Sequence, residues 1–363
     1  MNGKERILTT LSHREPDMVP LWELIIDEVV IKSIQDNLSY SDFIEKFDID
    51  GVTAGENIKF KEVEKGVYID EWGIKWRANK DGILYPIGGP IRNEKDIKTY
   101  SAPDPDVDYR MNKLEELLDR FKKDRFIVFL SHDVFEFSHY LVEGLQNLFR
   151  LYYRNSSVVH KLAEVVIEYK TRVSERALKL GADAIVGGDD YASRKGPLIS
   201  PLLFKKFIFP HLKRLVDVAK RNNRFFIKHT DGNIWPILDD IIKTGIDALH
   251  PIEPAACMDI LEIKKHFGDK ITVVGNIDCS IVLPHLSPKE VEEVVKETIA
   301  KAAPGGGYIL SSSNSIHPGV NPKNFIRMIK IAKTYGKYPI SPSFIKKYEN
   351  KDFYRTIFRC AKT

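Results

Sequence analysis

Eight short apolar runs along the chain each end in polar or ionisable residues. Most of the stretches between them repeat apolar residues every three to four positions, as amphipathic helices do. Strands that alternate with helices predict a parallel sheet, and eight such units predict a closed barrel with the helices outside. The runs are VPLW (ending at Glu23), DGVTAG (Glu56), RFIVFLS (His132, Asp133), ADAIVGG (Asp189, Asp190), RFFIK (His229, Asp231), DALHPI (Glu253), ITVVGNI (Asp278) and GYILSSS (Asn314).

The fold class predicted from this pattern is α/β, a (β/α)8 TIM barrel forming a single domain over residues 1–336. An open doubly wound sheet would alternate in the same way, but the count of eight favours closure. Residues 58–110 interrupt the rhythm after the second strand and are interpreted as an insertion over the barrel mouth. Residues 337–363 form a tail with two aromatic clusters, which either packs on the barrel or joins a partner.

Local signals predict several helix boundaries. Residues 3–12 and 155–180 have helical patterns, and VYIDEWGIKWRA alternates like a strand or hairpin. Ser200 before a proline is typical of a helix start, and Pro210 should kink or divide the helix that follows. SPKE at 287–290 has the spacing of a capping box.

Composition narrows the function classes. The chain has 363 residues, 43% of them hydrophobic and 29% charged, which is ordinary for a globular protein with a large core. A formal charge of +4, from 55 basic and 51 acidic residues, argues against a nucleic-acid partner. The sequence contains no run of eighteen apolar residues, so no membrane span is predicted. Three cysteines are too few for a disulfide framework, and the N-terminus lacks an apolar signal core, so a reducing cytoplasm is expected.

The segment RFFIKHTDG carries the strongest candidate chemistry. His229 and Asp231 are two residues apart, so on a continuing strand both face the same space. Imidazole and carboxylate are zinc ligands, and barrel active sites lie at the carboxyl ends of the strands. The alternative for Asp231 is a turn residue that caps the helix beginning near Ile234.

Two further metal ligands are expected near the next strand. Glu253 ends that strand and would neighbour His229 across the sheet, although a surface glutamate is the alternative. Cys257 follows four residues later, where a helix start would favour its thiolate; a small buried cysteine is the other interpretation. Cys279 directly follows Asp278, so both cannot point inward, and Cys279 is interpreted as packing.

Other strand ends offer acid/base and substrate-binding groups. Asp189 and Asp190 are adjacent and face opposite ways on a strand, unless they converge and one becomes a proton donor. Helix capping is the alternative for both. Arg194 lies in a basic loop that either holds substrate anions or is simply exposed. His317 either reaches the site from the loop after the last strand or is bonded to that loop.

Five motifs in this order resemble the uroporphyrinogen decarboxylase superfamily, and the resemblance extends to about residue 336. One branch of that superfamily decarboxylates uroporphyrinogen III without a cofactor. The other branch comprises zinc-dependent methyltransferases that move a methyl group between a corrinoid protein and a thiol or related acceptor. The motifs are GDDYASRKGPLISPLLFKKFIFPHLKRL, KHTDGNIWPILDD, HPIEP, GNID and PGGGYILSSSNSIHPGVNPKNF.

The chain departs from both branches. True decarboxylases carry an arginine-rich segment after the first strand, where this chain reads VPLWELIIDEVV with Glu23 and Asp27. An octa-acid substrate would meet carboxylates where it needs guanidinium groups. The methyltransferase branch commonly has His-x-Cys and a third ligand after strand eight. Here these positions fall on His229, Asp231 and Asn314, so only the histidine matches.

The resemblance implies a cytoplasmic, zinc-dependent methyltransferase that works with cobalamin carried on a partner corrinoid protein and with a small-molecule methyl donor or acceptor. A homodimer is expected by analogy with the family. A decarboxylase acting on a porphyrinogen or another carboxylate, and a barrel that only binds a ligand or a corrinoid protein, are the alternatives. The implied metal ligands are His229, Asp231, Glu253 and Cys257; the catalytic residues are Asp190, Asn314 and His317; the substrate-binding residues are Glu23, Glu56, Asp189, Arg194 and Asp278.

Overall fold

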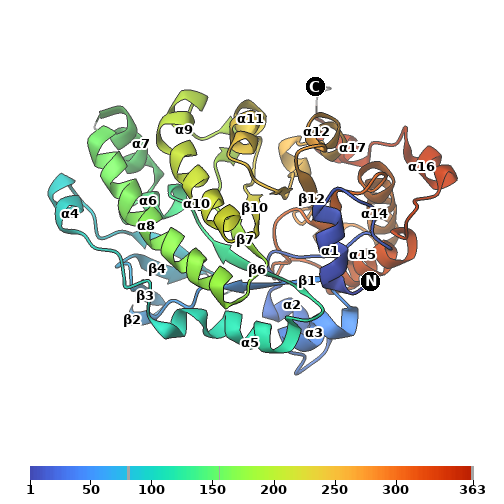
Figure 1. The fold of residues 1–363 in the computed structure, drawn as a ribbon, viewed down its shortest axis with the longest axis horizontal. Helices are drawn as coiled ribbons and strands as arrows, with labels where there is room; N and C mark the ends of the chain where they lie inside the picture. The colour runs from blue at the N-terminus through green and yellow to red at the C-terminus, as the bar shows by residue number, and fades with distance from the viewer. Residues whose placement is uncertain (80–81, 155, 361–363) are drawn as a thin grey trace.

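The computed structural model describes residues 1–79, 82–154 and 156–360, and its centre is a curled parallel sheet of seven strands (Figure 1). The sheet order follows the chain apart from the inserted strands, so each helical crossover returns to the neighbouring position, as in a TIM barrel. The strands in sheet order are β1 (Gly51–Gly55), β6 (Phe126–Ser131), β7 (Ala184–Gly187), β10 (Phe225–His229), β11 (Ala248–His250), β12 (Thr272–Ile277) and β13 (Tyr308–Ser312).

The predicted first strand is not a regular strand, although it occupies the eighth position of the barrel. Trp22 N donates to Leu310 O at 3.2 Å, and Leu310 N donates to Pro20 O at 2.9 Å. On the other side, Asp50 N donates to Leu21 O at 2.9 Å, just before β1. Pro20 has no N–H to add to a ladder. A short extended segment therefore lies between the two edge strands, and the TIM-barrel prediction holds with one irregular member.

Two apolar cores explain why the strands are rich in branched and aromatic residues. One core lies between the outer face of the sheet and the helices, and the other fills the barrel. Helix α1 (Gly3–Leu11) contributes Ile7 and Leu11 to the inner core. The other inner residues come mostly from alternate strand positions: Trp22, Leu24, Phe126, Val128, Ala184, Val186, Ile227, Ala248, Val274 and Ile309.

Most of the predicted helix boundaries are confirmed. Helix α1 carries an Asn2–Glu5 capping box, the long helix α8 spans Ser156–Leu180, and α14 (Pro288–Ala302) begins with the predicted box of Ser287 and Glu290. Pro210 divides the predicted helix into α9 (Pro201–Phe207) and α10 (Phe209–Arg221). The remaining helices are α2 (Glu28–Ile34), α3 (Tyr40–Phe47), α4 (Glu94–Thr99), η1 (Asp108–Met111), α5 (Asn112–Phe121), α6 (Phe135–Leu141), α7 (Leu145–Arg154), α11 (Trp235–Lys243), η2 (Pro254–Ala256), α12 (Ile260–Phe267), α13 (Val282–His285), α15 (Pro322–Tyr335), α16 (Pro342–Tyr348) and α17 (Phe353–Phe358).

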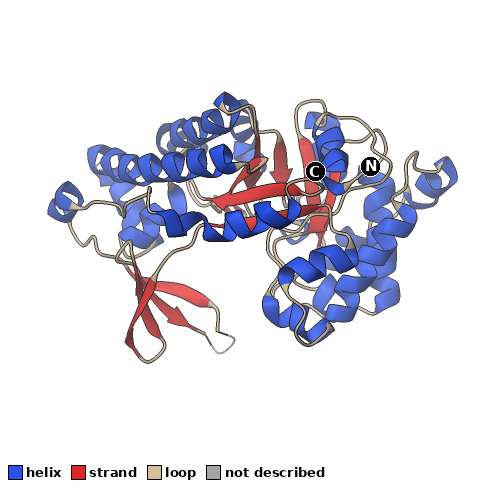
Figure 2. Cartoon of the chain, turned by 60° about the horizontal axis from the view of Figure 1, so that its bottom comes forward, coloured by secondary structure: helices blue, strands red, loops and turns tan. Residues whose placement is uncertain are grey.

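The region expected as an insertion contains a separate antiparallel sheet, which stands away from the main sheet in Figure 2. The predicted hairpin is present, because β3 (Val67–Asp70) pairs with β4 (Lys75–Ala78), between β2 (Phe60–Glu64) and β5 (Leu84–Gly88). Trp72 is fully buried against Phe137 and Tyr169. Residues 80–81 of the expected insertion lie outside the described residues.

The C-terminal segment packs against α14 of its own barrel. Tyr348 Oη donates to Glu293 at 3.1 Å, and Phe353 N donates to Glu297 at 3.2 Å. A disulfide joins Cys257 to Cys360, and Cys279 is free and buried. The expectation of a chain without disulfides was therefore wrong: folding brings together two cysteines 103 residues apart. Residues 361–363 of the expected tail lie outside the described part of the chain.

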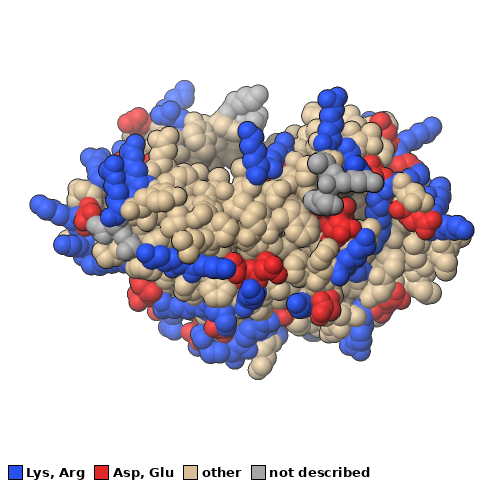
Figure 3. All heavy atoms as spheres, turned by 90° about the horizontal axis from the view of Figure 1, so that it is seen from above, with Lys and Arg blue, Asp and Glu red and all other residues tan. Residues whose placement is uncertain are grey.

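The charges are dispersed over the surface. In Figure 3, Lys and Arg side chains are spread around the periphery of the face seen from above, with acidic side chains among them. This distribution agrees with the near balance of 55 basic and 51 acidic residues. Among the described helices, none is both long and apolar enough to cross a bilayer.

Candidate active site at the barrel mouth

Three of the predicted residues meet at the carboxyl ends of neighbouring strands. His229 is the last residue of β10, Asp231 follows it, and Asp190 follows β7. His229 Nε2 lies 3.7 Å from Asp190 Oδ1 and 4.0 Å from Asp231 Oδ1. One ligand atom from each residue lies within 4.8 Å of the others, which is compact enough to surround a cation. Catalytic zinc sites use three protein ligands and keep a fourth position open.

Asp231 has an unsatisfied buried acceptor. Its Oδ1 has no hydrogen-bond partner among the described residues, whereas Asn314 Nδ2 donates to its Oδ2. Asp231 N donates to Asp190 Oδ1 at 2.7 Å. Burial, followed by the charges of Asp190 and Glu253, raises the pKa of Asp231 to about 9. An orphaned carboxylate oxygen beside an imidazole fits a site built for a cation or a proton.

A chain of hydrogen bonds fixes the orientation of the His229 ring. His229 Nδ1 lies 2.7 Å from His250 Nδ1, and His250 Nε2 lies 3.3 Å from Ser311 Oγ. Ser311 Oγ donates to Glu23 Oε2 at 3.2 Å. One direction of donation satisfies every member: His229 to His250, then to Ser311, then to Glu23. This direction leaves the Nε2 lone pair of His229 facing the two aspartates.

The electrostatics agree with a neutral His229. Burial, together with the nearby charges of Lys228 and His132, lowers the pKa of His229 to about 3. Burial also lowers the pKa of His250. Both rings are therefore neutral near pH 7, which the relay requires and which leaves His229 Nε2 available as a ligand. At the other end, burial raises the pKa of Glu23 to about 7, against the hydrogen bonds from Ser312.

A second cluster lies beside the first but has different chemistry. His132 Nδ1 lies 3.2 Å from both Asp189 Oδ1 and Glu136 Oε2. Burial alone would lower the pKa of His132, but the hydrogen bonds to Asp189 and Glu136 raise it to about 9. Asp189 also accepts backbone N–H groups at the start of α6, including Phe135 N at 2.7 Å. His132, Glu136 and Asp189 are a second group of three donors compact enough for a cation. Here, however, the carboxylates already pair with the imidazole and with backbone N–H groups.

A buried ion pair between Lys228 and Asp133 lies next to both clusters. Lys228 Nζ lies 3.1 Å from Asp133 Oδ2, and both side chains are 0% exposed. Lys228 Nζ also donates to Asp189 O at 3.0 Å, and Tyr191 Oη donates to Asp133. Lys228 precedes His229 on β10, so it ties the end of that strand to the segments after β6 and β7.

Glu253 and Arg194 lie beside the metal-sized cluster, paired with each other. Arg194 Nε donates to Glu253 Oε1 at 3.1 Å, and Gly232 N donates to Glu253 Oε2 at 2.9 Å. Glu253 is close enough to raise the pKa of Asp231 but is not in the group of three donors. Arg194 lies between the short strands β8 (Ala192–Ser193) and β9 (Gly196–Pro197).

Four expected substrate or acid/base residues have structural partners instead. Asp278 is fully buried and caps α13 by accepting from Val282 N at 2.9 Å. Glu56 is engaged by Arg110, at 3.2 Å, and by Tyr169 beneath the insertion. His317 donates from Nε2 to Cys279 O at 2.9 Å, and its Nδ1 accepts from Gly319 N. Asp278 and Asp189 accept backbone N–H groups at helix starts, whereas the partners of Glu56 are side chains. The substrate-binding and catalytic roles expected for these residues and for His317 stay predictions.

The expectation for Cys257 is corrected, and Glu23 has structural partners. Cys257 is bonded to Cys360, so it offers no thiolate to a metal. Glu23 does not line an open mouth, because it is buried and accepts from Ser312 N and both serine hydroxyls of β13. It stands at the end of the hydrogen-bond relay that begins at His229.

His250, His132 and Glu136 were not among the predicted site residues. His250 is paired in register with His229 across β10 and β11, so two histidines at adjacent strand ends were a usable signal. His132 was recognised as the end of an apolar run. Its contact with Glu136 depends on where α6 begins, which the run itself does not indicate. These residues are close to His229 because parallel strands end at the same edge of the barrel.

The barrel places a group of three possible metal donors at its strand ends, the position at which TIM-barrel enzymes have their active sites. The chain belongs to the uroporphyrinogen decarboxylase (URO-D) family, whose profile matches residues 69–335. The resemblance predicted from the ordered motifs is therefore confirmed, and membership of an enzyme family follows.

Two kinds of relative accompany this assignment. Uroporphyrinogen decarboxylase of Actinobacillus pleuropneumoniae serotype 5b is 24% identical over 266 residues, covering 68% of this chain and 72% of the relative. The Colwellia psychrerythraea enzyme of the same name is 26% identical over 270 residues, with the same coverage. The structure of a methyltransferase from Methanosarcina mazei has a TM-score of 0.75 at 17% identity and covers 92% of this chain and 99% of that protein. The methyltransferase is thus similar in fold, and the decarboxylases are similar in sequence over about two thirds of the chain.

Proposed function

We propose that this protein is a metal-dependent methyltransferase that moves a methyl group between a corrinoid-carrying partner protein and a small molecule. The observation that carries the proposal is the group of Asp190, His229 and Asp231, with an orphaned oxygen on Asp231 and a ring whose free nitrogen faces it. The fold shared with the Methanosarcina mazei methyltransferase also supports the proposal of methyl transfer.

The three donors fit a zinc ion. His229 Nε2, Asp190 Oδ1 and Asp231 Oδ1 would hold it, with the fourth position open to a substrate atom. Bound there, zinc supplies Lewis acidity toward a thiol or a methoxyl oxygen of the methyl donor or acceptor. Two carboxylates make a harder site than thiolates do, which favours an oxygen-containing substrate.

The neighbouring side chains orient these donors. Asn314 holds Asp231 Oδ2, which turns the orphaned Oδ1 toward the imidazole. The backbone N–H of Asp231 holds Asp190 Oδ1 at 2.7 Å, which links the ends of β7 and β10. Partners that bond the far side of a ligand set its orientation and basicity. Glu253, held by Arg194, lies next to Asp231 and bounds the site on the β11 side.

The proposal has several parts beyond the site. The partner is a corrinoid protein, the small molecule is the methyl donor or acceptor, and the protein is a cytoplasmic homodimer. Residues 1–336 form the catalytic domain, with residues 58–110 as an insertion over its mouth and residues 337–363 as a tail. The test is elemental analysis of protein purified without chelator, followed by transfer of a methyl group from a methoxylated aromatic compound to cob(I)alamin, which gives methylcobalamin and the free phenol. Protein without stoichiometric metal would contradict the proposal.

The second candidate is a decarboxylase, favoured by the names of the relatives at 24% and 26% identity. It predicts carbon dioxide release without a metal. Against uroporphyrinogen itself stands the acidic character of the mouth, where Asp190, Asp231 and Glu253 cluster beside His229. A substrate with many carboxylates needs guanidinium or ammonium partners there. Release of carbon dioxide from uroporphyrinogen by metal-free protein would favour this candidate over methyl transfer.

Zinc affinity is expected to rise with pH. Burial, followed by neighbouring carboxylates, raises the pKa of Asp231 to about 9 and that of Asp190 to about 7. Asp231 keeps its proton throughout pH 6 to 8, whereas Asp190 is mostly protonated only below about pH 7. Zinc affinity should therefore rise by about 100-fold per pH unit near pH 6, where two protons are displaced, and by about tenfold per unit near pH 8. His229 contributes nothing to this slope, since its pKa is lowered to about 3. Competition with a chromophoric chelator at pH 6, 7 and 8 measures the slope, and a flat or falling profile would contradict the assignment of these ligands.

Removing the charge of Glu23 should weaken zinc binding from a distance. In Glu23→Gln the end of the relay loses its carboxylate acceptor, and the preferred direction of donation from His229 is lost. We expect a decrease in zinc affinity of about tenfold, as for other partners of metal-bound histidines. The control is Glu56→Gln, which alters the ion pair with Arg110 without touching the relay and should keep the affinity. Unchanged zinc affinity in folded Glu23→Gln would show that the relay does not position His229.

A further inference from the structure

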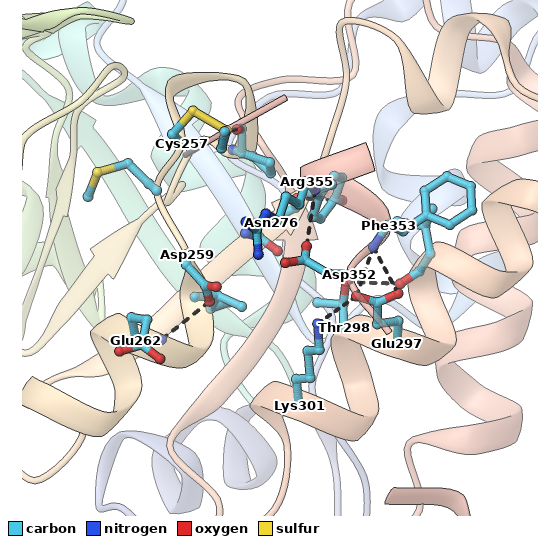
Figure 4. Close-up of a pocket in the computed structure, with 16 residues that line it drawn as sticks. Cys257, Asp259, Glu262, Asn276, Glu297, Thr298, Lys301, Asp352, Phe353 and Arg355 are labelled. Carbon is cyan, nitrogen blue, oxygen red and sulfur yellow. Dashed lines mark hydrogen bonds and ion pairs between the residues drawn. A yellow bond between two sulfur atoms is a disulfide. The ribbon is translucent and has the colours of Figure 1, made fainter. Parts of the chain in front are cut away.

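A cavity of about 340 Å³ lies outside the barrel mouth, between the helix layer and the C-terminal segment. Its walls come from η2 and α12 on one side, α14 on the other and the start of α17 above, and Asn276 of β12 forms part of its lining. Figure 4 shows Asn276 between the Cys257–Cys360 disulfide and the start of α17, where Asp352 caps the helix. The volume lies within the range of small-molecule sites.

Asn276 brings an unsatisfied acceptor to this cavity. The residue is only 1% exposed, and its Nδ2 donates to Ile252 O at 3.1 Å, which fixes the orientation of the amide. Its Oδ1 has no hydrogen-bond partner among the described residues. A buried acceptor without a donor is costly and rare, so a ligand with an N–H or O–H group would satisfy it.

The charges around the cavity select the kind of donor. Its lining contains four carboxylates and two cations. Two of the carboxylates are already paired with lysines, Glu297 with Lys301 at 2.6 Å and Glu262 with Lys265 at 2.8 Å. Asp259 and Asp352 remain against Arg355, which is exposed. The excess of carboxylates favours a cation over an anion. The carboxylates are Asp259, Glu262, Glu297 and Asp352.

Apolar walls complete the cavity. The lining includes Pro254, Met258, Ile260, Val294 and Phe353, which would cover the body of a ligand whose polar end reaches Asn276. We propose that this cavity is a binding site for a small organic amine with an apolar body, whose ammonium group donates to Asn276 Oδ1. The proposal is independent of methyl transfer at the barrel mouth, because it uses none of the residues there.

The disulfide anchors one wall of this site. Cys360 follows α17 and is bonded to Cys257, directly after η2, and both cysteines line the cavity. The segment between Asp352 and Cys360 is otherwise held by contacts such as Phe353 N with Glu297 and Tyr354 Oη with Asn276 O at 2.8 Å. Reduction should loosen this wall and weaken binding of the amine.

Calorimetric titration of the full chain with benzylamine, benzyl alcohol and benzoate tests the proposal. Benzylamine should bind once per chain and about fivefold tighter than benzyl alcohol, because a charged donor makes the stronger hydrogen bond. Benzoate should bind more weakly than either. Equal or tighter binding of benzoate would overturn the proposal, as would no saturable binding of benzylamine, which would mean that only water occupies the cavity.

Variants locate the binding. Asn276→Leu should lose at least fivefold in benzylamine affinity, and Arg355→Glu, which removes a cation at the surface, should gain about twofold at low salt. Asp190→Asn, at the barrel mouth, should bind benzylamine as the unmodified chain does. If Asn276→Leu does not fold, the proposal is tested by the benzylamine affinity of Arg355→Glu and of the protein reduced with dithiothreitol. Unchanged affinity in Arg355→Glu and after reduction, or a loss in Asp190→Asn, would contradict the site.

Discussion

Replacement of His229 by alanine is expected to lower zinc affinity by more than about 100-fold and to abolish methyl transfer, because it removes the only nitrogen donor of the three-residue group. The two remaining carboxylates repel each other and hold protons near neutral pH, so they bind zinc poorly alone. Zinc content after dialysis and chelator competition measure the loss. A His229→Ala protein that keeps stoichiometric zinc would place the metal elsewhere.

The matched control is His317→Ala. His317 also follows a barrel strand, but both of its ring nitrogens are bonded to backbone groups, Cys279 O after β12 and Gly319 N in its own loop. Its removal should therefore lower the free energy of unfolding by the contribution of these two hydrogen bonds and leave the zinc content unchanged. Loss of zinc in His317→Ala and retention in His229→Ala would reverse the assignment of the two histidines.

Replacement of Lys228 by methionine is expected to have the largest effect on stability. The ammonium group and Asp133 are both fully buried, so removal of Lys228 leaves an uncompensated carboxylate in the core. Loss of one member of a buried pair costs about 3–5 kcal/mol of unfolding free energy. Urea denaturation followed by circular dichroism measures the change. The control, Lys220→Met, removes a pair with Asp247 in which Lys220 is 41% exposed, and should cost less than about 1 kcal/mol.

A double variant separates the charge from the packing. Asp133→Asn removes the carboxylate charge but keeps an oxygen for the backbone N–H of Val134. Combined with Lys228→Met, it should be less destabilising than the sum of the two single changes, since no lone charge remains. Additive costs, or a cost for Lys228→Met below about 1 kcal/mol, would show that the ion pair does not hold the end of β10.

Local patterns in the sequence predicted the features that depend on neighbouring residues. The capping box at Ser287 and Glu290, the division at Pro210 and the long helix α8 are set by residues within a few positions. The alternation of strands and helices likewise predicted the barrel and the edge on which His229, Asp231 and Asp190 meet. The segment around Pro20, in contrast, makes backbone hydrogen bonds to both edges of the barrel sheet. The hydrophobic pattern did not indicate that this segment is an irregular strand.

Features that depend on distant contacts were not predictable from one chain. Asp189 and Asp278 have the same strand-end position as Asp190, yet they accept backbone N–H groups of helices. Whether a carboxylate caps a helix or faces the site depends on where the next helix starts in space, which strand-end spacing does not determine. The disulfide between Cys257 and Cys360 joins residues 103 apart, and the relay through His250 depends on strand register.

The central claim is that Asp190, His229 and Asp231 form a zinc site at the barrel mouth. The most direct measurement is a crystal structure of the zinc-loaded protein with anomalous scattering recorded on both sides of the zinc edge. The account predicts one strong peak about 2.0–2.1 Å from His229 Nε2, bound also by oxygens of Asp190 and Asp231. A mouth without a peak, or zinc bound at other residues while His229 Nε2 stays free, would contradict it.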